Sequence, residues 1–123
     1  MKNVTTLLEA MPPALPEPAH VMTVRVDLPP GDPGAPPHRH SGPVFGYVLE
    51  GELRFELEGE PVRVLKEGET FWEPGGDVIH YQDGNARGDG WTRFLAVMVC
   101  VPGAPMLTYV GEDELRAKGR LPG

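Results

Sequence analysis

Alternation of apolar and polar residues is the dominant pattern along the chain. From Met22 to Leu28, apolar side chains occupy every second position and polar side chains lie between them. The segment 51–59 alternates in the same way. Because successive side chains of a strand point to opposite faces, both segments are predicted to be strands with one buried and one solvated face.

Further short apolar segments follow, separated by glycine- and proline-rich turns. Further strands are predicted over 61–65, 70–74, 77–82 and 91–101. Turns recur at roughly the eight-to-twelve-residue spacing of an antiparallel sandwich or barrel. One helix is predicted over 112–118, which is acidic at its start, basic at its end and followed by Gly119. The sequence therefore predicts an all-β antiparallel barrel or jelly roll with a short C-terminal helix.

The composition is compatible with one folded domain. The 123 residues include 16 glycines and 15 prolines, a proportion also found in disordered chains. However, Leu, Val, Phe and Ile together make up about a quarter of the chain, which is enough to bury a core. We expect a single domain over 1–123, with a barrel core at about 21–101, an N-terminal arm over 1–20 and a C-terminal tail and helix over 102–123.

Charge and cysteine content limit the partners. The formal net charge of -7 disfavours binding to nucleic acid or to an anionic membrane surface. The longest apolar run, 94–101, is too short to span a bilayer, and the N-terminus does not resemble a signal peptide. The only cysteine, Cys100, excludes an intrachain disulfide. We expect a soluble, cytoplasmic protein whose partner is a small molecule.

Two of the four histidines, His38 and His40, are separated by one residue. On a strand both imidazoles would face the same side, about 6 to 7 Å apart along the backbone. Neutral imidazoles at this spacing can converge on one metal ion. Taken alone, the same pattern also describes two exposed loop histidines.

The surrounding residues resemble the two motifs of the cupin superfamily. The first motif is matched by His38, His40 and Gly51, and the second by Gly68, Pro74, Gly76 and His80, with Asn85 after it. The resemblance covers roughly 21–101 and implies a double-stranded β-helix, the cupin jelly roll. It also implies that His38, His40 and His80 bind one divalent transition metal per chain, with iron, manganese, nickel, copper and zinc all open.

The chain departs from the cupin pattern in two places. The position of the usual acidic ligand is occupied by Val44, so the carboxylate ligand is expected to be missing. Three residues rather than two separate Gly76 from His80, so the intervening turn must differ. Three histidines still suffice for a metal site, and some cupin dioxygenases use an all-histidine iron site.

Other side chains near the motifs are candidates for supporting roles. Gln82 would share the face of His80 on a regular strand, as a fourth ligand or as a hydrogen-bonding partner of the site. Tyr47, Phe55 and Trp72 are candidate pocket walls, although residues such as Tyr47 and Trp72 are more often ordinary core or surface aromatics. Glu73 is expected to be a solvated carboxylate at the end of a strand rather than a catalytic base.

Two functions remain open on the sequence alone. The first is a mononuclear metal-dependent enzyme, a three-histidine dioxygenase of the iron type that acts on a small organic molecule. The second is a non-catalytic cupin that binds or senses a metal or small molecule, and Val44 favours it. A homodimer is expected in either case, because small cupins usually cover an exposed sheet edge by pairing through an N-terminal strand.

Overall fold

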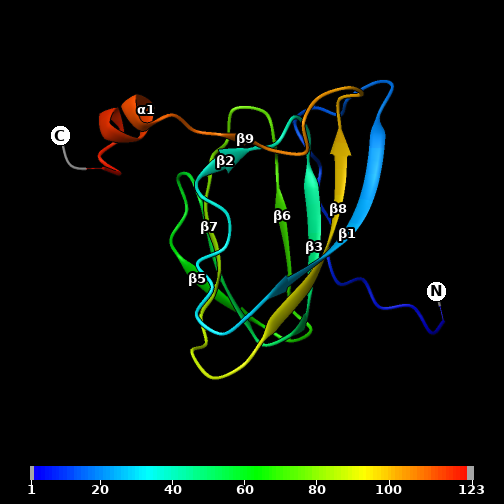
Figure 1. Cartoon of the computed structure of the whole chain (residues 1–123). Coiled ribbons are helices and arrows are strands. Elements are labelled where there is room, and N and C mark those ends of the chain that lie inside the picture. Colours follow the sequence, from blue (N-terminus) through cyan, green and yellow to red (C-terminus); the bar gives the residue numbers. More distant parts are fainter. Residues whose placement is uncertain (1, 122–123) are drawn as a thin grey trace.

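The computed structural model describes residues 2–121, and its strands form two antiparallel sheets that face each other (Figure 1). The first sheet has the order β1 (His20–Leu28), β8 (Thr92–Cys100), β3 (Val44–Glu50) and β6 (Thr70–Glu73). The second has the order β5 (Arg63–Lys66), β4 (Glu52–Leu57), β7 (His80–Asn85), β2 (His38–Arg39) and β9 (Thr108–Tyr109). The predicted all-β jelly roll is confirmed, but the sheets do not close into a barrel because no strand of one sheet pairs with a strand of the other.

Strand pairing follows the predicted alternation most closely in β1 and β8. These two strands pair along their full length, from His20 opposite Cys100 to Leu28 opposite Thr92. On the other side of β8 lies β3, which the alternation did not single out as a separate strand. Gly46 interrupts the apolar positions of β3, and a side chain there would collide with the ring of Phe71. The missing side chain allows Phe71 to lie across the interior.

The hydrophobic core fills the space between the two sheets. Its buried members come from the inward-facing positions of both sheets, as period-2 alternation requires: Leu28, Val44, Val48, Leu53, Phe55, Leu57, Leu65, Phe71, Phe94, Ala96, Met98 and Cys100. A smaller apolar cluster joins Ile79, Tyr81, Val110 and Leu115 under the C-terminal segment.

The predicted C-terminal helix is confirmed as α1 (Glu112–Ala117). Ion pairs hold it against the five-stranded sheet: Arg39 of β2 lies 2.5 Å from Glu114, and Lys118 lies 2.7 Å from Glu58. Arg39 points outward, so its two neighbours along the chain point inward. No helix in the described part of the chain is long and apolar enough to cross a membrane.

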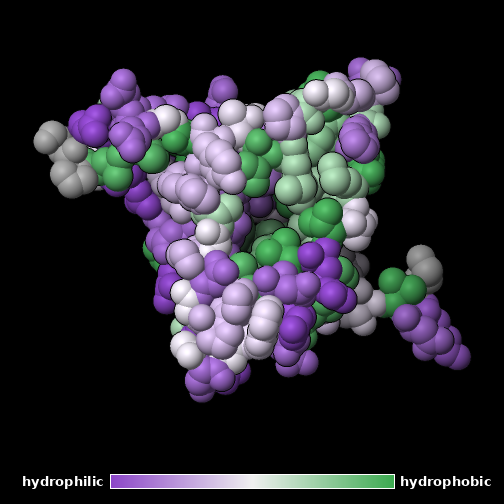
Figure 2. Space-filling view, in the orientation of Figure 1, coloured by the Kyte–Doolittle hydropathy of each residue, from purple (hydrophilic) through white to green (hydrophobic). Residues whose placement is uncertain are grey.

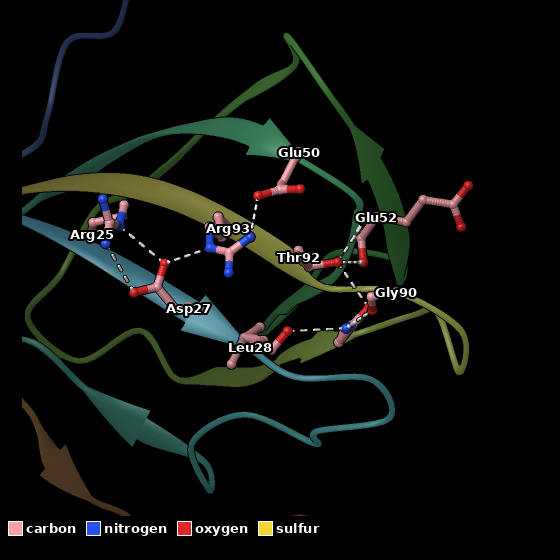
Figure 3. Close-up of polar contacts among 9 residues, drawn as sticks. Arg25, Asp27, Leu28, Glu50, Glu52, Gly90, Thr92 and Arg93 are labelled. Carbon is pink, nitrogen blue, oxygen red and sulfur yellow. Dashed lines mark hydrogen bonds and ion pairs between the residues drawn. The ribbon is translucent and has the colours of Figure 1, made fainter.

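Asn85 ends β7 and joins the loops at one end of the sandwich, where Leu28, Gly90 and Thr92 lie near one another (Figure 3). Its buried amide donates to the backbone carbonyls of Leu28, Pro29 and Gly90 over 2.8 to 3.2 Å. Its carbonyl oxygen lies 2.8 Å from the Thr92 hydroxyl and accepts the backbone N–H of residue 87. This motif asparagine therefore holds the loop after β1 in place, and that loop forms one wall of the cavity described below.

Candidate metal centre

His38 and His40 enter the interior from the short strand β2 and the residue after it. Their side chains are buried, whereas Arg39 between them faces α1. The Nδ1 atom of His38 donates to the carbonyl of Pro36 at 2.7 Å, and Nδ1 of His40 donates to the carbonyl of Met106 at 2.8 Å. Each carbonyl fixes the tautomer of its ring and leaves Nε2 with a lone pair, which is the usual arrangement behind a metal-binding histidine.

His80 begins β7 directly opposite His38 in the strand pairing. The chain reaches it through a turn at Gly75 and Gly76, both with positive φ, and the N–H of Gly76 donates to the carbonyl of His40 at 2.8 Å. A side chain at position 75 would collide with the backbone of Gly42. Glycine is therefore required where this turn passes the His40 segment, and the turn accommodates the extra residue before His80.

Glu73 joins the three histidines from the opposite sheet. It ends β6, is only 4% exposed, and lies directly across from Val44 of β3. Its Oε1 atom is 3.3 Å from Nδ1 of His80 and 3.6 Å from Nε2 of His40. The predictions that Glu73 is solvated and that no carboxylate reaches the histidines are therefore wrong. In this chain the carboxylate comes from position 73, directly across the strand pair from position 44, where the cupin pattern has its acidic ligand.

The four side chains form a compact group of possible ligands. One ligand atom from each of His38, His40, Glu73 and His80 lies within 4.8 Å of the others, and all four residues are buried. Both ring nitrogens of His80 are buried and make no well-aligned hydrogen bond with residues 2–121, and Nδ1 has only the Glu73 carboxylate 3.3 Å away. A buried ring nitrogen without a hydrogen bond is costly, and a divalent ion would satisfy it. Three imidazoles and a carboxylate suit a first-row transition metal.

Burial and the Glu73 carboxylate shift the pKa values of His38 and His80 in opposite directions. Burial holds the pKa of His38 below its usual 6.5, so this ring is neutral and able to ligate near pH 7. Burial also opposes the charged form of His80, but the adjacent Glu73 carboxylate outweighs it and raises the pKa of His80. Conversely, burial disfavours the Glu73 carboxylate, yet the three nearby imidazoles hold the pKa of Glu73 below 4.5. Without a metal, both shifts favour the charged forms of Glu73 and His80, which lie 3.3 Å apart.

A cavity of about 250 Å³ adjoins the four residues. It opens between the loop after β1 and the loop after β8, and Figure 2 shows a recess there with apolar atoms along its rim. The loops contribute Asp32, Gly34, Ala35, Met106 and Leu107. The sheets contribute mainly apolar side chains: Val26, Leu28, Val44, Phe71, Phe94, Ala96 and Met98.

The prediction that Gln82 shares the face of His80 fails because β7 is bulged. Glu56 of β4 pairs with Gln82, but the next residue, Leu57, pairs with His80, so Tyr81 is an extra residue in β7. The bulge reverses the alternation, and the Gln82 amide donates to Glu56 at 2.7 Å on the outer face. Asp83 instead lines the cavity, and burial raises its pKa above 3.8. No sequence signal distinguished Asp83 as a site residue.

The three aromatic residues predicted as pocket walls do not line the cavity. Trp72 lies between the inward Phe71 and Glu73 of β6, so it points outward and stacks on Phe45 with ring centroids 6.4 Å apart. Tyr47 likewise lies at an outward position of β3. Phe55 is buried in the core, where its ring packs against the His80 ring at 4.8 Å. Phe55 therefore helps to hold the ring of His80, a candidate ligand, in position.

The chain is similar to one protein family and to several solved structures. The family model described as "Cupin domain" matches residues 24–98. No significant match was found among curated proteins. Among solved structures, a cupin family protein with a double-stranded β-helix fold from Methanocaldococcus jannaschii is 25% identical over 68% of this chain and 72% of its own, with a TM-score of 0.58.

Two further solved structures have enzymatic descriptions. A predicted oxalate decarboxylase from Thermotoga maritima is 28% identical over 68% of each chain, with a TM-score of 0.56. An oxalate oxidase in complex with the substrate analogue glycolate is 27% identical over 83% of this chain, with a TM-score of 0.61. This chain spans only 57% of the length of that oxidase.

Proposed function

Because the chain belongs to the cupin family, we propose that it is a mononuclear metal-dependent enzyme of the oxygenase type that acts on a small organic molecule. One observation carries the proposal: the ligand atoms of His38, His40, Glu73 and His80 gather within 4.8 Å beside a cavity. A purely structural cluster of buried ionisable groups would not require an adjoining cavity.

Side chains of this chain would hold the ion, and backbone carbonyls would orient two of them. His38, His40, Glu73 and His80 would hold the ion, and the carbonyls behind His38 and His40 would orient their rings. When bound, such an ion supplies Lewis-acid chemistry and, if redox-active, electron transfer. The apolar walls exclude water from the reacting groups and strengthen the electrostatic interactions there.

The size and lining of the cavity limit the substrate. A volume of about 250 Å³ admits a molecule comparable with a substituted benzene ring, since roughly 150 Å³ suffices for benzene itself. The similarity to an oxalate oxidase and a predicted oxalate decarboxylase supports chemistry on a small molecule. It does not assign oxalate to this chain, because fold similarity does not transfer a substrate.

Metal analysis and single-site variants test the proposal. Purified protein should contain close to one iron, copper, manganese or nickel ion per chain, whereas zinc or no metal would favour a binding or sensing role. Metal at about 100 times its Kd should stabilise the fold by roughly 2.7 kcal/mol, a rise of several degrees in Tm. Substituting His38, His40 or His80 by Ala should abolish most of that rise.

The control is His20→Ala, because His20 is exposed at the start of β1. This variant should keep the full metal-induced rise in Tm. If all four alanine variants respond to metal as the wild type does, the cluster is not a metal site and the enzymatic proposal is refuted.

We also propose that residues 1–123 form one domain and that this domain acts as a cytoplasmic homodimer. The edge strand β1 and the N-terminal arm support association, since Val4, Leu7, Met11 and Leu15 of the arm are all more than half exposed. Such exposed apolar side chains and an open sheet edge favour pairing. Cys100 is buried and unpaired, which suits a reducing compartment.

A further inference from the structure

Outside the group of four possible metal ligands, the charged side chains among residues 2–121 that line the cavity are all acidic. Asp32 and Asp83 contribute carboxylates, whereas no lysine or arginine from residues 2–121 lines it. Outside the metal cluster, a carboxylate substrate would therefore find no lysine or arginine side chain to bind it. Like charges brought together in a partly desolvated site repel each other strongly.

Each of the two carboxylates accepts one backbone N–H at 2.8 Å, Asp32 from Gly34 and Asp83 from Ala35, but only Asp83 lies on a strand of the sheets. Its Oδ1 atom accepts the N–H of Ala35 at 2.8 Å. Gly34 packs so closely that a Cβ atom there would lie 2.3 Å from the same oxygen. The bulge in β7 turns this side chain inward, and no described residue donates a hydrogen bond to its Oδ2 atom. One oxygen is thus anchored and the other is available to a ligand.

The carboxylate of Glu73 differs, because its charge is already balanced. It lies 3.3 Å from His80 and 3.6 Å from His40, and in the proposed function it would also face the metal ion. Asp83 forms no ion pair with an arginine or lysine among the described residues. A ligand that lies against the Oδ2 atom of Asp83 must therefore present a hydrogen-bond donor to it.

We propose that Asp83 determines the specificity of the cavity by binding a hydroxyl or protonated amine of a small, largely apolar molecule and by excluding carboxylates. This inference rests on the proposed function in so far as the same cavity receives the substrate. A hydroxyl or ammonium group satisfies Oδ2 with a hydrogen bond, while the rest of the molecule contacts Leu28, Phe94 and Met98. A carboxylate can donate no hydrogen and repels Asp83.

Three molecules of similar shape test this proposal: benzyl alcohol, benzylamine and benzoate. Their affinities are measured by ligand-observed NMR titration at pH 7.5 with EDTA-treated protein, so that direct coordination by a metal does not contribute. We expect benzylamine and benzyl alcohol to bind the wild type at least roughly tenfold more tightly than benzoate, equivalent to about 1.4 kcal/mol. In Asp83→Asn the ratio of benzylamine to benzoate affinity should fall at least tenfold.

Asp83→Asn keeps an oxygen that can accept the Ala35 N–H, so the loop should remain in place. Asp89→Asn is the matched control, because Asp89 is 79% exposed and pairs with Arg87 outside the cavity. It should leave all three affinities unchanged. Benzoate binding as tightly as benzylamine, an unchanged ratio in Asp83→Asn, or no saturable binding of any probe would each overturn the proposal.

A parallel zinc titration separates this inference from the proposed function. Asp83→Asn should bind zinc as the wild type does, because Asp83 is not in the four-residue group. If neither protein binds zinc while the selectivity for benzylamine persists, the metal-centre proposal fails and the assignment of Asp83 stands. If both bind zinc and the selectivity is absent, the reverse holds.

Discussion

Moving the carboxylate of the proposed metal centre from position 73 back to position 44 tests its ligand set directly. Val44 and Glu73 are cross-strand partners in β3 and β6, and both are buried. Side chains of such a pair start only about 5 Å apart at Cβ. Two variants are needed, Glu73→Val alone and Glu73→Val combined with Val44→Glu. The double variant keeps the same two side chains and exchanges their strands.

The expected magnitude follows from the surroundings of Glu73. Its carboxylate is 4% exposed and lies within 3.6 Å of two imidazoles. Removing one partner from a buried charged group costs roughly 3 to 5 kcal/mol. Loss of the carboxylate should therefore weaken zinc binding by about 3 kcal/mol, which is a rise in Kd of somewhat more than a hundredfold. The double variant should recover most of this loss.

Isothermal titration of zinc into EDTA-treated protein, with a competing chelator if binding is tight, measures each Kd. Glu67→Gln is the control, because Glu67 is an exposed carboxylate in the turn between β5 and β6. It should bind zinc with the wild-type Kd. The reasoning is refuted if Glu73→Val stays within about threefold of the wild type. It is also refuted if the double variant binds no better than Glu73→Val, provided its circular dichroism shows an intact fold.

Zinc affinity should fall as the pH drops through the folded-state pKa of His80, which lies above 6.5, because protons compete for the imidazoles; a pH-independent Kd from titrations between pH 6 and 7.5 would exclude histidine ligation. Asn85→Ala should lower the free energy of unfolding by roughly 2 to 4 kcal/mol, because the hydrogen bonds to three backbone carbonyls are lost; a loss under 1 kcal/mol in urea would contradict this role. Arg120 hydrogen-bonds to Glu56 and lowers its pKa below 4.5, so Arg120→Gln should cost about 1 kcal/mol at pH 7. That difference should shrink as the pH falls below 4.5 and vanish below the folded-state pKa of Glu56, and a difference that is undiminished in urea denaturation at pH 3 would show another cause. Light scattering should give twice the chain mass of 13.4 kDa, and the chain mass at every concentration would exclude the homodimer.

Local patterns in the sequence determined the strands and the histidine part of the site. Period-2 alternation identified β1 and β4, since the direction of a side chain along a regular strand depends only on its own position. The spacing of His38 and His40 made a shared face predictable for the same reason. The inward position of Glu73 was also readable in principle, because it lies two residues after Phe71 in β6.

The tertiary structure decided what depends on relations between strands. The register of β3 and β6 places Glu73 opposite Val44, and no local pattern specifies which residues of two strands meet. The bulge at Tyr81 turns Gln82 outward and Asp83 inward, because one extra residue in a strand reverses the faces of those that follow. The histidines of this site were therefore predictable from the sequence, whereas the approach of Glu73 to them and the inward position of Asp83 required the pairing of the strands.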